Sequence, residues 1–517
     1  MREKLKEYMK TVVDAYLLLL LVILPVYMRN GLVMIGDEKY YFFRNGTLVF
    51  MVLVIIGGIL WWKDSRFKIQ WKLSMTDMAV MLFGVASVVS FLGSADKYTA
   101  FLGYADWHMG LLSQMMFVWI YFVASRWYSG EENVWKIAGA SACVVFLLGV
   151  LNRMEIDPLG IYNGMDLWDW NRNNLLSTIG NSNWYCGYAS VASAIVLYYC
   201  YKGEGWIRIV GMLGMLITFA TLVTQGSESA YPFIAAMLLV LLLCSLGSRR
   251  NFMNFIRTVC LLPIACIFFQ FLLKFTNVPL RLNTDGSMSA VLFFQGWWVI
   301  LLLLMILYVV EGYREKEGMP DCFATGKIRK VTCIVLLGLA ALVIVIIIAC
   351  QLSEETWIAL GSIKYLRLNN EWGNERGMLW YMSVRTWLNG DIKQFFIGVG
   401  PDCFANVIYN TFSVTDMLGV SGQWENAIFA NAHNEWLNML VNEGILGALA
   451  YLGIFVTAFY GLWKRKDDKL IMIVLLAIAG YMANATFSFQ QVVSTPLMFA
   501  VLGMGEQLIR SKKKEGK

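Results

Sequence analysis

Long runs of uncharged, mostly apolar residues alternate with short polar segments along most of the chain. A helix of roughly 17–25 apolar residues crosses a hydrocarbon layer about 30 Å thick, and many of these runs have that length. The pattern therefore predicts an all-α integral membrane protein with about 14 transmembrane helices (12–14). The predicted spans lie near residues 12–28, 46–62, 76–93, 109–126, 134–151, 183–201, 207–224, 229–247, 258–275, 289–310, 331–351, 444–463, 470–487 and 491–509.

The last two predicted spans come from one uncharged stretch, residues 471–505. A continuous helix of that length would extend about 52 Å, because each residue adds about 1.5 Å. Such a helix is too long for one crossing of the membrane. The polar residues between Asn484 and Gln491 therefore predict a turn that separates two spans.

The longest polar interruption, residues 352–432, divides the chain into three parts. Residues 1–351 hold the first eleven predicted spans, and residues 433–517 hold the start of an interfacial helix, the last three spans and a basic tail. A loop this long normally has structure and a function of its own. Within it, Arg376–Leu388 predicts an amphipathic helix that ends at Asn389 and Gly390, before a Gly/Pro turn, FFIGVGPDCF. The prediction is one large loop that contains short helices.

The distribution of charge predicts the orientation. The chain is 58% hydrophobic, with 42 Lys and Arg, 36 Asp and Glu, and a net charge of +6. With the N-terminus in the cytoplasm, most basic residues fall on the cytoplasmic side, as the positive-inside rule requires. We therefore expect a multi-pass protein of the cell (plasma or inner) membrane, with both termini cytoplasmic and the large loop extracytoplasmic. Membrane lipids are expected partners, and the net charge indicates no nucleic-acid partner.

The cysteines and carboxylates predict no metal site and no cofactor. The ten cysteines are scattered, mostly inside apolar runs, and no two form a CxxC pair. This spacing argues against a disulfide framework and against a zinc site. The adjacent pair Asp467 and Asp468 falls in a predicted cytoplasmic segment, so it does not support a metal-binding role at the extracytoplasmic face.

His433, one of only two histidines, stands where the long loop ends and a helical pattern begins. The apolar residues that follow it repeat at helical spacing. A helix N-terminus carries partial positive charge, which disfavours imidazolium and keeps the ring neutral. A neutral imidazole is the form that a general base needs. The alternative interpretation is an interfacial histidine that caps or packs, and Asn434 next to it suits either a cap or a group that orients His433.

Two arginines in the predicted loop helix are candidates for binding an anion. Arg376 and Arg385 are nine residues apart, so they point about 180° apart on a helix. At most one of them therefore faces the same site as His433. Arg376 is favoured because it lies at the exposed end, after the Asn-rich run 369–374. Arg385 has apolar neighbours and suits snorkelling or a lipid phosphate.

Three motifs resemble the O-antigen ligase family: HNEWLNMLVNEGILGALAYL after a long loop, ERGMLWYMSVRTWLNGDIKQFFIGVGPDCF within it, and STIGNSNWYCGY before a middle span. The resemblance implies a GT-C-like membrane glycosyltransferase that is inverting and metal-independent. Its donor would be a glycan on polyprenyl (undecaprenyl) diphosphate. The acceptor would be a hydroxyl of a glycan, lipid or protein on the extracytoplasmic face.

The resemblance also implies the roles of particular residues. The family's histidine maps onto His433 as general base, and its loop arginine maps onto Arg376 as the diphosphate clamp. The sequence departs from the family at Thr224–Ala230, where Glu228 stands in place of an expected basic residue. The residues expected to bind substrate are Arg281, Arg172, Asn434, Trp380, Asn181 and Asn183.

Two alternatives to a ligase remain from the sequence. The first is a polysaccharide polymerase of the same chemistry, in which the acceptor is another lipid-linked repeat. The second is a transporter or flippase that moves the lipid-linked sugar intact. Transporters commonly show repeated halves and charges at mid-membrane. The chain shows no clear internal repeat and few charges within its spans, which favours an enzyme.

Overall fold

The computed structural model describes residues 2–62, 72–164, 174–276, 280, 287–370, 372–412 and 429–515. Over these residues the protein is helical, apart from a two-stranded antiparallel hairpin in which β1 (Leu175–Leu176) pairs with β2 (Gly180–Asn181). The predicted all-α class is confirmed.

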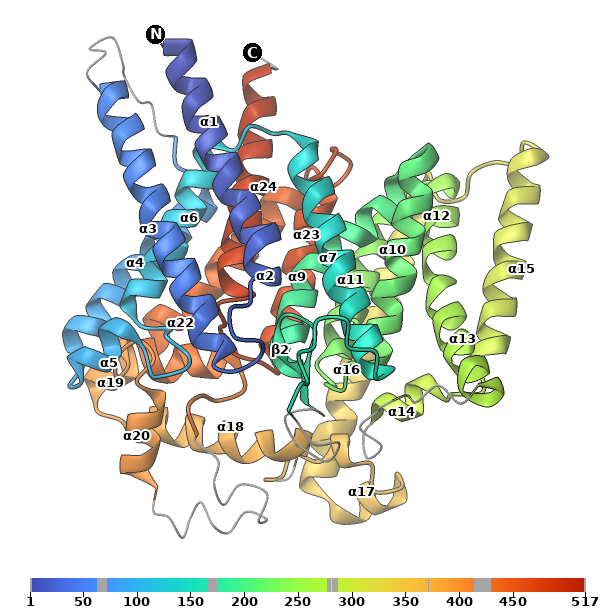
Figure 1. The fold of residues 1–517 in the computed structure, drawn as a ribbon. Coiled ribbons are helices and arrows are strands. Elements are labelled where there is room, and N and C mark those ends of the chain that lie inside the picture. The colour runs from blue at the N-terminus through green and yellow to red at the C-terminus, as the bar shows by residue number, and fades with distance from the viewer. Residues whose placement is uncertain are drawn as a thin grey trace.

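The first 351 residues form most of the helical bundle (Figure 1). The N-terminal helix α1 (Arg2–Leu18) continues through a π-helical turn, η1 (Leu19–Ile23), into α2 (Leu24–Val26). The helices that follow are α3 (Ile35–Trp62), α4 (Met75–Gly93), α5 (Lys97–Leu102), α6 (Leu111–Trp127), α7 (Glu132–Arg153), α9 (Ser182–Lys202), α10 (Gly205–Thr224), α11 (Ala230–Ser245), α12 (Arg249–Val259), α13 (Leu261–Phe275), α14 (Ser287–Leu292), α15 (Trp297–Lys316) and α16 (Lys327–Leu352).

The long loop contains short helices, as predicted, and three helices follow it. The loop elements are α17 (Glu354–Ala359), the 3-10 turn η2 (Lys364–Leu366), α18 (Trp372–Asn389), α19 (Ile392–Ile397) and α20 (Phe404–Thr411). The C-terminal helices are α22 (Glu435–Trp463), α23 (Ile471–Ala485) and α24 (Thr495–Glu515). The predicted turn near residues 484–491 lies between α23 and α24.

The predicted number of spans is too high. Among the described residues, nine helices are long and apolar enough to cross a membrane, and α11 and α23 are shorter apolar helices. Every predicted span coincides with a helix, but α6 has 17 residues, α11 has 16 and α23 has 15. The reason is visible in α9 and α23, whose residues are almost all buried in protein. An apolar run can reflect burial in protein as well as contact with lipid. A helix that contacts other helices does not need a length or composition matched to the hydrocarbon, so counting apolar runs gives too many spans.

The helices differ in how much of their surface packs against protein. Helix α9 packs against α23 and α10, while α22 packs against α4, and α24 against α6. In contrast, only 6% of the most apolar part of α15 and of α16 is buried. Their exposed Leu, Ile and Val side chains suit direct contact with lipid. The structure is therefore that of a multi-pass membrane protein.

Both termini lie at one end of the bundle, and the helices of the long loop lie at the opposite end (Figure 1). Helix α18 runs across that end, roughly perpendicular to the bundle. This arrangement is the one expected if both termini share one side of the membrane and the loop occupies the other. That the loop side is extracytoplasmic stays a prediction.

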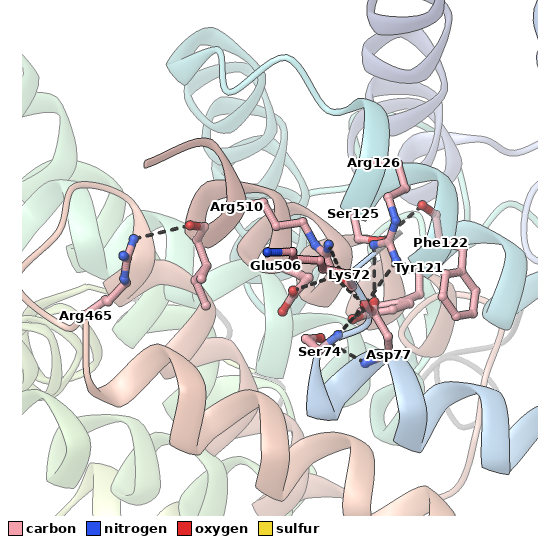
Figure 2. Close-up of polar contacts among 11 residues, drawn as sticks. Lys72, Ser74, Asp77, Tyr121, Phe122, Ser125, Arg126, Arg465, Glu506 and Arg510 are labelled. Carbon is pink, nitrogen blue, oxygen red and sulfur yellow. Dashed lines mark hydrogen bonds and ion pairs between the residues drawn. The ribbon is translucent and has the colours of Figure 1, made fainter. Parts of the chain in front are cut away.

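A charged cluster joins three helices at the end that carries the termini (Figure 2). The Asp77 side chain of α4 is fully buried, with Arg126 Nη2 of α6 at 3.0 Å from its Oδ2 and Tyr121 donating to its Oδ1 at 2.9 Å. Arg510 of α24 also pairs with Asp77. A buried carboxylate is costly unless it is paired and hydrogen-bonded, so this cluster fixes α4, α6 and α24 together.

At the loop end, α22 is interrupted at Gly444, which has φ 67° and ψ −174°. The interruption releases carbonyl groups from the helical ladder. Backbone N–H groups of the loop bond to them, from Val399 to the carbonyl of Val441 at 3.2 Å and from Gly400 to that of Asn442 at 2.9 Å. The sequence motif GVGPD is therefore the segment that docks the long loop onto α22.

We expect Gly444→Ala to destabilise the protein strongly. A Cβ at this position would lie 2.4 Å from the backbone of Phe396, and a left-handed backbone costs a non-glycine residue about 1–3 kcal/mol by itself. The measurement is the thermal unfolding midpoint of the purified protein in detergent. The control is Gly461→Ala in the same helix, where a Cβ meets nothing within 4 Å. A midpoint for Gly444→Ala that equals the control's would contradict the prediction.

Candidate functional site

His433 immediately precedes α22 and has an uncommon backbone conformation. Its φ is 45°, in the left-handed region that few non-glycine residues adopt. The side-chain oxygen of Asn431 accepts a hydrogen bond from the His433 N–H at 3.0 Å, and that of Asn434 accepts one from the Leu437 N–H at 3.1 Å. Asn434 is thus the N-cap of α22. The asparagines hold His433 in its conformation, while a substrate contact by Asn434 stays a prediction.

Aromatic residues from distant parts of the chain fix the imidazole ring. The ring lies edge-to-face with Phe489, with centroids 5.1 Å apart, and Phe489 meets Trp107 in the same manner at 4.6 Å. Trp107 in turn packs against Trp184 at 5.8 Å. The Nδ1 atom of His433 is buried and has no hydrogen-bond partner among the described residues. The ring is therefore oriented by packing, and this nitrogen is not engaged by the described chain.

The surroundings of His433 keep it neutral. Burial lowers its pKa to about 3, and the positive charge of Arg376 contributes in the same direction. The sequence predicts a neutral ring because of the helix N-terminus, whereas in the structure the main cause is burial. Helix α18, which holds Arg376, packs against α22, which begins directly after His433.

Arg376 lies in the first half of α18 and is only partly engaged by protein. Its Nη1 donates to the carbonyl of Gly373 at 2.8 Å, and its Nε is buried without a partner among the described residues. Burial lowers the pKa of Arg376, while the negative charge of Glu228 raises it. At the next residue, Gly377, a Cβ would lie 1.9 Å from the carbonyl oxygen of Asn369. Only glycine allows this close approach, which fixes the chain beside Arg376.

The structure distinguishes the two candidate arginines. Arg385 lies over the ring of Tyr381, with 5.8 Å from its guanidinium carbon to the ring centroid. Arg376 is the arginine whose charge acts on His433. The preference for Arg376 rests on the prediction of an exposed position at the end of the helix, whereas in the structure its Nε is buried, and its role as the site residue stays a prediction.

The motif STIGNSNW contributes to the same region through the start of α9. Asn181 caps α9, accepting from the Asn183 N–H at 2.8 Å, and the Asn183 side-chain oxygen accepts from the Ser227 hydroxyl at 2.6 Å. The adjacent Glu228 accepts a hydrogen bond from the Tyr365 hydroxyl, 2.9 Å from each carboxylate oxygen. Both asparagines therefore have local structural roles, and Asn183 ties α9 to the segment that carries Glu228.

Trp380 forms an aromatic surface on α18 one turn after Arg376. It packs against Trp372 at 4.9 Å and Phe487 at 6.2 Å between ring centroids. Its indole N–H is buried and has no partner among the described residues. The other two predicted substrate-binding residues, Arg172 and Arg281, lie outside the described residues.

Asp402 in the GVGPD turn is a residue that the sequence analysis did not single out. Its Oδ2 accepts hydrogen bonds from the backbone N–H groups of Tyr104 and Met109, at 2.7 and 2.9 Å. Burial raises its pKa to about 7, while these two bonds oppose the shift. Asp402 thereby holds the loop that carries Trp107. The sequence marks this aspartate as part of a turn, and its partners are too distant in the chain for any pattern to indicate them.

Neither a scan of protein-family models nor a search of curated proteins found a match to this chain. Among the described residues, no group of three or more His, Cys, Asp or Glu side chains is arranged as metal ligands.

We expect the His433 imidazole to stay neutral across the physiological range. Because its folded-state pKa is lowered to about 3, its NMR signals should not change between pH 5 and 8. The chain has only two histidines, so selectively labelled protein gives two sets of signals, and His433→Gln identifies one of them. A midpoint between pH 5 and 8 for the His433 signals would contradict the prediction.

Proposed function

We propose that the protein is a membrane glycosyltransferase of the O-antigen ligase type. It would transfer a glycan from a polyprenyl-diphosphate donor to an acceptor hydroxyl on the extracytoplasmic face. The observation that carries the proposal is the packing of α18, which holds Arg376, against α22, which begins directly after His433, at the end of the bundle where the helices of the long loop lie. The GT-C-like fold that the resemblance implies is part of this proposal.

Arg376 would bind the diphosphate. An arginine presents several N–H donors in a planar fork and binds phosphate oxygens in bidentate fashion. The buried Nε without a partner in the described chain is a donor ready for such an oxygen. When the bond between the anomeric carbon and the diphosphate oxygen breaks, its electron pair stays on that oxygen. The guanidinium would stabilise this added negative charge.

His433 would accept the proton of the acceptor hydroxyl as its oxygen attacks the anomeric carbon. Attack opposite the diphosphate would invert the configuration at that carbon. A base works best when its pKa is near the operating pH, and an imidazole with a pKa of about 3 is weakly basic. A diphosphate bound to Arg376 would counter its positive charge, the smaller of the two causes that lower this pKa, and the remaining negative charge of the diphosphate would favour a protonated imidazole. Donor binding would therefore raise the basicity of His433 when it is needed.

The aromatic side chains beside the two residues suit a carbohydrate. Trp380 and Trp372 lie on the same helix as Arg376. Trp107 packs against Phe489, which itself packs against the His433 ring. Indole faces present apolar surface with a polar N–H edge, which matches the C–H faces and hydroxyl edges of sugars. This supports a glycan as the transferred group. A polymerase would use the same residues, with another lipid-linked repeat as acceptor.

We expect His433→Ala and Arg376→Ala to abolish most transfer. General-base catalysis contributes about 10²–10⁴ in rate, and one group that stabilises developing negative charge contributes about 10²–10³. The assay supplies purified protein with a polyprenyl-diphosphate oligosaccharide and source-cell membranes as acceptor, and measures released polyprenyl diphosphate. The matched control is Arg385→Ala, on the same helix as Arg376, which should retain turnover.

Three results would contradict the proposal. Near-normal release by either variant would remove that residue from the mechanism. A loss of turnover in Arg385→Ala equal to the loss in Arg376→Ala would show that substitutions in α18 disturb the helix in general and not the diphosphate site. Movement of intact donor across a vesicle without release of polyprenyl diphosphate would identify a transporter. The chain length of the glycan product distinguishes a ligase from a polymerase.

A further inference from the structure

The proposed diphosphate site contains a carboxylate beside its cation. Glu228 lies between α10 and α11, and its negative charge raises the pKa of Arg376. A carboxylate beside an anion-binding arginine weakens the binding that the arginine provides, because like charges repel. Its presence needs an explanation within the reaction.

Contacts on two sides hold Glu228 in this place. The Tyr365 hydroxyl donates to both carboxylate oxygens at 2.9 Å, and the Tyr365 carbonyl accepts from the indole N–H of Trp372 at 3.2 Å. Trp372 is the first residue of α18, which carries Arg376. On the other side, the neighbouring Ser227 bonds to Asn183 of α9 at 2.6 Å. Glu228 is therefore fixed with respect to the helix of Arg376.

The repulsion from a fixed carboxylate grows with the charge of the ligand. The donor is a diphosphate diester, with one ionised oxygen on each phosphorus. The released polyprenyl diphosphate is a monoester, and cleavage leaves it with an additional ionisable oxygen. On an arginine without a neighbouring carboxylate, the product would therefore bind more tightly than the donor and occupy the site.

We propose that Glu228 opposes Arg376 so that the polyprenyl diphosphate product is released instead of remaining bound. Glu228 would be a counter-charge that sets the preference between donor and product, and Tyr365 would hold it in position. The inference rests on the proposed function, because it assigns the diphosphate to Arg376.

The experiment measures binding of two ligands to the purified full-length protein by calorimetry. Farnesyl diphosphate represents the product, and farnesyl-diphosphate-linked N-acetylglucosamine represents the donor. Removing one nearby negative charge in Glu228→Gln should tighten binding by about five- to tenfold for each ligand charge. Both ligands should therefore bind more tightly, and farnesyl diphosphate should gain about five- to tenfold more than the donor analogue.

Two further variants separate charge from structure. Glu228→Asp keeps the charge and should keep the wild-type ratio of the two dissociation constants. Glu354→Gln removes an exposed carboxylate of the same loop, which pairs with Arg367 at 3.7 Å, and should also leave the ratio unchanged. In turnover assays, Glu228→Gln should lower kcat and strengthen inhibition by farnesyl diphosphate, while single-turnover transfer is not slowed.

The outcomes are distinct. An unchanged ratio in Glu228→Gln, equal tightening of both ligands, or weaker binding of either would overturn the role of Glu228 while leaving the transferase proposal intact. A wild-type protein that binds neither ligand, or binding that is unaffected by Arg376→Ala, would overturn both proposals.

Discussion

The interruption of α22 at Gly444 is the feature on which the arrangement of the loop end depends. A backbone carbonyl without a donor costs several kcal/mol in a membrane-like environment, so a helix can break there only where other groups supply hydrogen bonds. Val399 and Gly400 supply two of them, and the Ser90 hydroxyl of α4 donates to the Asn442 carbonyl at 2.8 Å. The same turn places Asp402, which holds the loop of Trp107. One backbone irregularity therefore joins the long loop, α4 and α22.

Both ends of the bundle contain buried charged and polar groups. At the end with the termini, both oxygens of Asp77 receive donors from neighbouring helices, and the result is structural cohesion. At the loop end, Nδ1 of His433, Nε of Arg376 and Nε1 of Trp380 are buried without a partner in the described chain, and Nε of Arg510 in the Asp77 cluster is buried in the same way. Buried polar groups are normally satisfied, so each exception calls for an explanation. For the three groups at the loop end, the proposed explanation is a bound substrate.

Carboxylates near the proposed site show how strongly burial decides the role of a residue. Glu435 follows Asn434 in a pattern that suits a helix cap or a solvated face, yet it is 2% exposed and accepts a hydrogen bond from Tyr481 at 2.9 Å. Glu443 is 1% exposed and accepts from the Ser87 hydroxyl of α4. The partners come from helices tens or hundreds of residues away. Spacing along one helix cannot indicate them.

Local pattern was enough for the helical class, a helix at each predicted span, the presence of short helices in the loop and the turn between α23 and α24, because these follow from apolar run length and from residues close in sequence. Helical spacing separates the faces of α18, so it limits the arginines that can share a site with His433 to one, while the roles of His433 and Arg376 stay predictions. The number of spans, the partners of Asp402 and the placement of Glu228 beside Arg376 depend on which helices surround each other. Only the tertiary structure decided them, because burial and electrostatic interaction act between residues that are close in space and remote in the chain.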